Sequence, residues 1–311
     1  MKRTKRIFIL IAFLGASLFG FSQDDNYFSS LFNGHDLCNW MMPKGIPSFN
    51  VTDGIMVTTC PGGSDLFTQN DFGNFIFRFE YSLSKVGNSG VFIHCDPNQS
   101  PRTGFEVQLL APWTPYRDDL HCTGSVYGHV EVSNRPDETT EIWHSMEIKC
   151  DRKNITILVD DKVTTVANID TVESLKSKPL TGKIGFQSNH SNKGEYVKFR
   201  NIRIRNLDAE PEYVKAGFFD EDSVVRKLSY KAAVKIGVPM IGLLAQMLNS
   251  ENIMARAGAK QVLFDITAQS ASSESERISA AGALRNSLEH CAGEAANDYL
   301  DWLLKMAEYS D

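Results

Sequence analysis

The sequence predicts a mainly β protein, an antiparallel sandwich or barrel, followed by a separate α-helical segment. Between about residues 28 and 207, short runs alternate apolar and polar side chains with the period of two that half-buried strands show. Turn signals such as Pro61-Gly62-Gly63 and Asp160-Asp161 separate these runs, and no helical pattern intervenes. Beyond residue 219, alanine becomes frequent and apolar residues recur with the helical period.

The strand prediction is clearest at residues 75–82, where Phe75, Phe77, Phe79 and Tyr81 share one face. In the last run of the β region, Val197 and Phe199 have one parity, whereas Ile202 and Ile204 have the other. A β-bulge near Asn201 would bring all four to the core. Further strands are expected at Gly90–His94, Phe105–Leu110, His144–Cys150, Asn154–Val159, Lys183–Gln187 and Tyr196–Arg205.

Length and composition indicate an ordinary globular protein of two domains. The chain has 311 residues, and domains usually run to roughly 100–200 residues. Apolar residues make up 42% and charged residues 23%, which excludes wholesale disorder. The net charge is −6, and the one basic cluster lies in the first six residues. We therefore expect no nucleic-acid partner, because binding phosphates requires a clustered basic surface.

The first 23 residues have the pattern of a secretory signal peptide. Lys2, Arg3, Lys5 and Arg6 precede an apolar run from Ile7 to Phe21, which is short for a membrane span. An uncleaved anchor is the alternative. We expect cleavage, a mature protein that is periplasmic or secreted, and no membrane span after cleavage.

The rest of the chain divides into a β region at residues 24–207, a linker at 208–219 and a helical domain at 220–311. Arg226 and Arg256 precede alanine-rich stretches in similar settings, which suggests HEAT-like helix pairs. An unrelated small helical bundle is the alternative. The Ser- and Ala-rich segment Ala268–Glu276 is expected to be a loop.

Six cysteines are present: Cys38, Cys60, Cys95, Cys122, Cys150 and Cys291. Their spacing matches no zinc ribbon and no CxxC redox motif. A bridge between Cys95 and Cys122 would be compatible with export. Buried free thiols are the alternative, because cysteine packs well in cores.

A carboxylate and an amide lie side by side on one predicted strand. Glu106 and Gln108 share one face, while Phe105, Val107 and Leu109 take the other. Polar groups on a strand cost free energy unless that face is wet or the groups are paired. This pattern fits the polar wall of a sugar site, and a solvated outer sheet face is the alternative. Aromatic residues that could stack on a sugar lie nearby in the sequence: Trp113, Tyr116, Tyr127 and Trp143.

Seven segments, in order along residues 28–207, resemble those of the DUF1080 family, also called the 3-keto-disaccharide hydrolase family. They are Leu31–Trp40 (family LFNGKDLxGW), Asn88–Phe92 (NSGIF), Phe105–Leu110 (YEVQIL), Thr123–Gly128 (TGSLYG), Trp143–Ile148 (EWNTMEI), Ile184–His190 (IGLQxH) and Phe199–Ile204 (FRNIRI). The helical tail lies outside the resemblance.

The resemblance implies a concanavalin A-like jelly-roll sandwich and cleavage of glycosides already oxidised to a ketone at C3. The ketone acidifies the proton on C2, so a general base can remove it and the C1 substituent can depart. Water can then add to the product. Such a site needs a base and a partner for the enolate oxygen. It does not need the paired carboxylates of ordinary glycosidases.

Within this resemblance we expect Glu106 to act as the base or as a metal ligand, and His190 as the second acid or base. Gln108 is expected to bind a hydroxyl or the ketone. His94 stands where many relatives have arginine, so its part in stabilising the oxyanion is in doubt. Further substrate-binding residues are expected to be Asn88, Tyr127, Trp143 and Gln187. A divalent ion held by Glu106, His190 and His94 is a possible cofactor.

Two other functions remain open. A non-catalytic carbohydrate-binding module would share the fold, because fold does not imply function. Alternatively, the helical tail docks a protein partner, such as the oxidoreductase that makes the 3-keto sugar. In each case the expected small ligand is a carbohydrate.

Overall fold

A computed structural model describes residues 26–59, 63–99, 103–113, 117–188, 190, 194–290 and 293–309. The expected leader at residues 1–23 lies outside the described residues, as do Cys60, Tyr116 and Cys291. Among the described residues, no single helix is long and apolar enough to cross a membrane. One sharply bent helix pair, Ser223–Ile236 with Val238–Met247, passes the same test by length and composition.

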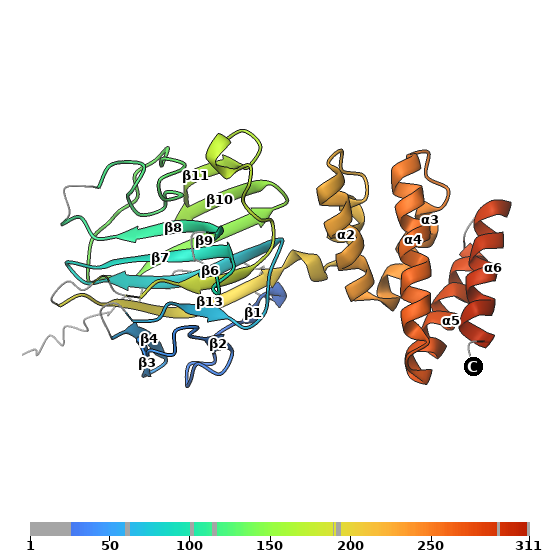
Figure 1. The fold of residues 1–311 in the computed structure, drawn as a ribbon, viewed down its shortest axis with the longest axis horizontal. Helices are drawn as coiled ribbons and strands as arrows, with labels where there is room; N and C mark the ends of the chain where they lie inside the picture. The colour runs from blue at the N-terminus through green and yellow to red at the C-terminus, as the bar shows by residue number, and fades with distance from the viewer. Residues whose placement is uncertain are drawn as a thin grey trace, which may run out of the picture.

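The β region is a sandwich of two antiparallel sheets, shown at the blue-to-yellow end of Figure 1. The larger sheet has the order β11-β10-β9-β6-β13-β4-β3, with β1 also paired to β13, and the smaller has the order β2-β5-β12-β7-β8. The strands are β1 (Ser29–Ser30), β2 (Trp40–Met41), β3 (Phe49–Thr52), β4 (Ile55–Thr58), β5 (Leu66–Thr68), β6 (Phe75–Leu83), β7 (Asn88–Cys95), β8 (Phe105–Leu110), β9 (His144–Asp151), β10 (Asn154–Val159), β11 (Lys162–Asn168), β12 (Lys183–Phe186) and β13 (Val197–Asn206). The prediction of a jelly-roll sandwich is confirmed.

Aromatic side chains fill the space between the two sheets. The alternation predicted for β6 is confirmed, because Phe75, Phe77 and Phe79 are fully buried. From the opposite sheet, Phe186 places its ring 5.4 Å from that of Phe79 and 4.1 Å from that of Phe199. Each buried aromatic ring contributes about 1.5–3 kcal/mol through the hydrophobic effect. This packed core holds the two sheets, and the residues on their outer faces, in fixed positions.

The β-bulge predicted near Asn201 is confirmed. The pairing of β13 with β6 shifts register between Arg200 and Arg203, and Asn201 has a positive φ of 53°. The Asn201 amide donates to Glu80 Oε1 at 2.5 Å, which holds the left-handed conformation in place. Because the bulge inserts a residue, Phe199 and Ile202 both reach the core.

The helical region consists of α1 (Pro211–Gly217), α2 (Ser223–Ile236), α3 (Ile241–Met247), α4 (Ile253–Ser270), α5 (Glu274–His290) and α6 (Glu294–Tyr309), with short 3₁₀ turns at Leu207–Ala209 and Val238–Met240. The prediction of a linker at 208–219 is wrong, because α1 lies there and buries Val214 in the helical core. The loop expected at 268–276 is also wrong except at residues 271–273. Ser and Ala there continue α4 and begin α5.

Two helix pairs repeat with an offset of 30 residues: α1 and α3 begin at Pro211 and Ile241, and α2 and α4 begin at Ser223 and Ile253. The capping residues repeat too, because Asp222 accepts from Val224 N at 2.6 Å and Asn252 accepts from Ala255 N at 3.0 Å. The HEAT-like assignment of these pairs stays a prediction.

The helical region lies at one end of the sandwich (Figure 1), and polar contacts join the two. Tyr213 donates to Asp151 Oδ1 at 2.7 Å, and Lys153 pairs with Asp222. Asn74 donates from its backbone and its side chain to the two oxygens of Asp208, at 2.8 and 2.7 Å.

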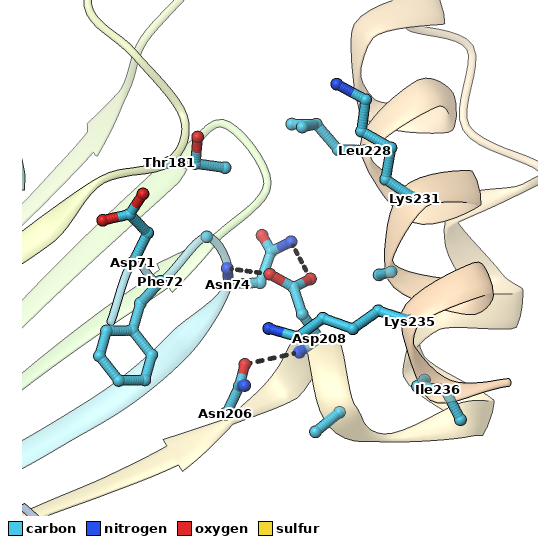
Figure 2. Close-up of a pocket in the computed structure, with 13 residues that line it drawn as sticks. Asp71, Phe72, Asn74, Thr181, Asn206, Asp208, Leu228, Lys231, Lys235 and Ile236 are labelled. Carbon is cyan, nitrogen blue, oxygen red and sulfur yellow. Dashed lines mark hydrogen bonds between the residues drawn. The ribbon is translucent and has the colours of Figure 1, made fainter. Parts of the chain in front are cut away.

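A cleft of about 540 Å³ remains between the two regions. In Figure 2, Lys235 extends from α2 into this cleft toward Asp208 and Asn206. No residue predicted to belong to the sugar site lines it. The search for that site therefore turns to the sheets themselves.

Candidate functional site on the outer face of the smaller sheet

The polar residues of β8 point away from the core. Val107 and Leu109 are fully buried between the sheets, so Glu106 and Gln108 take the outer face. The neighbouring strand β7 behaves in the same way, with Val91 in the core and Gly90 facing out. The polar pattern in the sequence therefore marks one face of one sheet.

Strand register brings residues from four strands into a row across this face. Gly90 of β7 lies opposite Gln108 of β8. Phe186 of β12 pairs with Val91 and with Leu66 of β5, so Gln187, one residue further, lies between Gly90 and Asp65. The bond from Gln187 N to Gly90 O, 2.8 Å, confirms this continuation. The row thus runs from Asp65 through Gln187 and Gly90 to Gln108.

Gly90 makes room for the side chain of Glu106. A Cβ atom at position 90 would lie 2.5 Å from Glu106 Oε1 and 2.9 Å from its Cγ. With hydrogen in place of a side chain, the Glu106 carboxylate can lie across β7 toward β12. This explains why a glycine lies within this largely buried strand.

A chain of hydrogen bonds joins three of the predicted site residues. Gln187 Nε2 donates to Glu106 Oε1 at 3.0 Å, and Gln187 Oε1 lies 2.7 Å from His190 Nε2. Because an amide oxygen only accepts, His190 Nε2 must carry the proton, which leaves Nδ1 as the acceptor in the neutral ring. The structure therefore links Glu106 and His190 through Gln187 and sets the histidine tautomer.

Gln108 and Asn88 form a second polar pair on the same face. Gln108 Nε2 donates to Asn88 Oδ1 at 3.2 Å. Gln108 Oε1 is buried and has no hydrogen-bond partner among the described residues. An unsatisfied buried acceptor costs about 1–3 kcal/mol, so this atom is suited to accept from a bound molecule.

The segment after β8 runs beside β8 and extends this face on its far side. Val126 bridges Val107, so Tyr127 lies beside Glu106 and Ser125 beside Gln108. The backbone bonds Tyr127 N to Glu106 O, 2.9 Å, and Gln108 N to Ser125 O, 3.1 Å, agree with this register. The Tyr127 side chain is 42% exposed and packs edge-on against His121. On the other side of Glu106 in this register lies Phe92 of β7, which is buried.

A family match covers all of these residues. Residues 27–205 match the family described as the 3-keto-alpha-glucoside-1,2-lyase-like domain. The chain belongs to this family. No curated protein matches the chain.

Two solved structures share the fold of this lyase-like domain. Two crystal structures of a candidate glycosyl hydrolase from Parabacteroides distasonis are each 21% identical with a TM-score of 0.52. They match 60% and 58% of this chain and 97% and 98% of their own chains. A β-glucanase from Bacillus licheniformis is 15% identical with a TM-score of 0.41, over 57% of this chain and 95% of its own.

The lyase-like domain holds His94 away from the others, contrary to the sequence-based expectation. The positive φ of His94, 55°, turns its ring toward the core side, where it meets the rings of Phe75 and Phe105 edge-on. His94 Nε2 lies 2.8 Å from the Gly73 carbonyl oxygen. Burial lowers the pKa of His94 to about 4. His94 is therefore a neutral packing residue and does not share the face of Glu106.

Trp143 was also predicted to bind substrate, but the structure does not bring it to the face that holds Glu106. It precedes β9 and lies on the outer face of the larger sheet, where Arg200 stacks over its ring at 4.0 Å. Arg200 in turn bonds Glu80 at 2.8 Å on that same face. Both sheets therefore lie between Trp143 and Glu106. The resemblance to the family motif gave no sign of which sheet face Trp143 occupies.

The set proposed for a divalent ion is not brought together. His94 lies on the opposite side of its sheet, and Gln187 stands between Glu106 and His190. Within the described ranges, no three His, Cys, Asp or Glu side chains are grouped to hold a metal ion. Cys95 and Cys122 are free thiols, so the bridge between them is not formed and the alternative of buried thiols holds for both.

Sequence reasoning missed Asp65, which the fold brings to the same row. Its Oδ1 accepts from Ser188 N at 2.9 Å, one residue after Gln187. Burial raises the pKa of Asp65, against the opposing effect of the hydrogen bonds from Ser188 and the charge of Lys44. The strand that follows, Leu66–Thr68, is short, and all three of its residues are buried. Such a run carries no alternation that would have marked Asp65 as facing out.

Proposed function

We propose that this protein cleaves 3-keto-glycosides on the outer face of the smaller sheet, with Glu106 as the general base. The observation that carries the proposal is the Glu106–Gln187–His190 chain on a polar face of a 3-keto-alpha-glucoside-1,2-lyase-like domain. Gln187 fixes one carboxylate oxygen of Glu106. The other oxygen is then oriented by the same bond, which is what a positioned base requires.

The proposed reaction is an elimination. Glu106 removes the proton from C2, and the C–H electron pair forms the enolate with the C3 ketone. The enolate then expels the C1 substituent, whose oxygen takes a proton as the C1–O bond breaks. His190 can supply this proton from Nδ1 in its imidazolium form, while Nε2–H stays bonded to Gln187 Oε1 beside the base. Addition of water to the resulting enone gives the free 3-keto sugar.

Replacing the base should abolish turnover without unfolding the protein. We expect Glu106→Gln to lower kcat by roughly 10²–10⁴-fold on a 3-keto-glucoside, because a positioned base contributes about that much. The assay measures aglycone release by residues 24–311, with and without added divalent metal. Glu251→Gln, an exposed carboxylate at the start of the α4 region, is the matched control. Equal rates for Glu106→Gln and wild type would contradict the proposal.

A carbohydrate-binding module is the second candidate function. The unsatisfied Gln108 Oε1 and the exposed ring of Tyr127 suit sugar binding without any chemistry. Saccharide binding in calorimetry, combined with no turnover of any 3-keto-glycoside, would favour this function over catalysis.

Export to the periplasm or the medium is part of the proposal and rests on the pattern of residues 1–23. The mass of the mature protein from the native host should correspond to a chain that begins near Asp24.

A further inference from the structure

We propose that Asp65 is a further substrate-binding residue, and that saccharide hydroxyls bind along the row between Asp65 at one end and Gln108 at the other. The identity of the ligand as a saccharide rests on the proposed function. The place of Asp65 in the row rests on strand register alone.

The row has the dimensions of a saccharide site. Gly90 and Gln108 lie in β7 and β8, and Asp65 and Gln187 lie directly beside the ends of β5 and β12, which are adjacent strands of the same sheet. Three inter-strand spacings separate its ends, a distance of roughly 14 Å between backbones. Gly90 at the centre presents no side chain. The Glu106 carboxylate reaches over it from the next row and therefore borders the row between its two ends.

Both ends of the row have more acceptor positions than the hydrogen bonds described there fill. Asp65 is half-buried and accepts from the backbone N of Ser188 at 2.9 Å and also from the Ser188 side chain. A carboxylate has about four acceptor positions. Gln108 Oε1 is buried and has no hydrogen-bond partner among the residues that the structure describes. Partly buried acceptors of this kind are satisfied by a ligand rich in O–H donors, which is the chemistry of a polyol.

The charges on this face favour a neutral saccharide over an acidic one. Glu106 and Asp65 are both acidic, and an anionic sugar would meet two carboxylates on the way in. Lys44 lies close enough to act on the carboxyl of Asp65, but it stands at the far end from Glu106. A uronic acid is therefore expected to bind more weakly than the corresponding neutral sugar.

The test measures binding and turnover in the same proteins. Asp65→Ala should raise the Kd for maltose and the KM for 3-keto-maltose roughly tenfold or more, since hydrogen bonds to a charged group are the strong ones. It should change kcat less than about threefold, because Asp65 does not contact the reacting carbon. Asp298→Ala, on the exposed side of α6, should change none of these values.

A second variant guards against misfolding. Asp65→Asn keeps an oxygen for Ser188 N, so it should fold as wild type does in circular dichroism and still raise the Kd by about fivefold. Unchanged Kd and KM in this variant would overturn the inference, even if turnover by wild type is normal. Weaker maltose binding by the variants would support it, even if no 3-keto-glycoside is cleaved. Failure of wild type to bind any saccharide would overturn it.

Discussion

At the scale of single residues, a glycine without a side chain shapes the proposed site as much as its polar residues do. Gly90 is the example, because it decides where the Glu106 carboxylate lies. The hydrogen bond from Gln187 then holds the carboxylate in that place. The rate of proton removal depends on how precisely the base is positioned. Neighbours such as Gly90 and Gln187, which take no part in the reaction, can therefore affect the rate.

Gly90→Ala should therefore reduce activity far more than stability. The new methyl group displaces the flexible end of Glu106 and breaks the contact with Gln187. We expect kcat to fall by about 10–100-fold, while Tm stays within about 3 °C of wild type. Kinetics and a thermal melt of the same sample check this. In Gly242→Ala nothing lies within 4 Å of the added Cβ, so that control should keep full activity. Full activity in Gly90→Ala would show that Glu106 does not need this position.

At the same scale, the buried His94 makes the free energy of unfolding depend on pH. Burial lowers its pKa from 6.5 to about 4, so between these values the unfolded chain binds a proton that the folded protein refuses. Its contribution is therefore complete above pH 6.5 and is lost as the pH falls toward 4. From pH 7 to pH 5 this loss is about 2 kcal/mol.

Urea unfolding at pH 7 and pH 5 checks the effect of His94. His94→Gln keeps a donor for the Gly73 carbonyl but does not titrate, so its stability should fall by about 2 kcal/mol less than that of wild type. The carboxylates of the protein contribute equally in both proteins and cancel in the comparison. The same pH dependence in both would show that His94 is accessible to protons in the folded state.

At the scale of secondary-structure elements, the 30-residue repeat provides equivalent positions with different surroundings. Asp222 and Asn252 cap α2 and α4 in the same way. Only Asp222 also pairs with the sandwich, through Lys153. The two caps therefore separate what capping contributes from what contact between the regions contributes.

Asn252→Ala should lower the free energy of unfolding by about 1 kcal/mol, the usual value of a lost cap. Asp222→Ala should lose the same amount and up to about 1 kcal/mol more for the exposed ion pair. Urea unfolding at low and at high salt measures both. The extra loss in Asp222→Ala should shrink at high salt, because screening weakens the ion pair. If the extra loss in Asp222→Ala does not change with salt, it does not come from the ion pair with Lys153.

At the scale of the whole molecule, two separate hydrophobic cores are joined by polar contacts. The sandwich core and the helical core share no residue. The proposed site lies on a sheet face, whereas the helices pack against the end of the sandwich near Asn74 and Asp151. Asp208, in the turn between β13 and α1, fastens that turn to the sandwich through its two bonds to Asn74.

Truncation tests this division of labour. Residues 24–210 retain Asp208 and should fold, and their kcat/KM on a 3-keto-glucoside should be within about threefold of that of residues 24–311. A large loss of kcat/KM in a folded truncated protein would mean that the helices contribute to the site. In that case the cleft lined by Lys231 and Lys235 would become the place to look.

Much of the fold could be predicted because local patterns carry it. The alternation in β6, the bulge at Asn201 and the helical period beyond residue 219 are all visible over a few residues. Short strands such as β5 and β12 are harder, since three or four buried residues show no alternation. The helix α1 was missed because Pro and Gly resemble a linker, although Pro at the first turn favours a helix.

The sequence alone determined the family, the sandwich and the shared face of Glu106 and Gln108, because side-chain parity along one strand is a local property. Tertiary structure decided which residues meet them. Register across four strands brought Gln187 and Asp65 to that face. One positive φ turned His94 into the core, and the layer order of the sandwich placed Trp143 on the other side. Pairing between strands far apart in the chain is a long-range property, and nothing in the spacing of these residues encodes it.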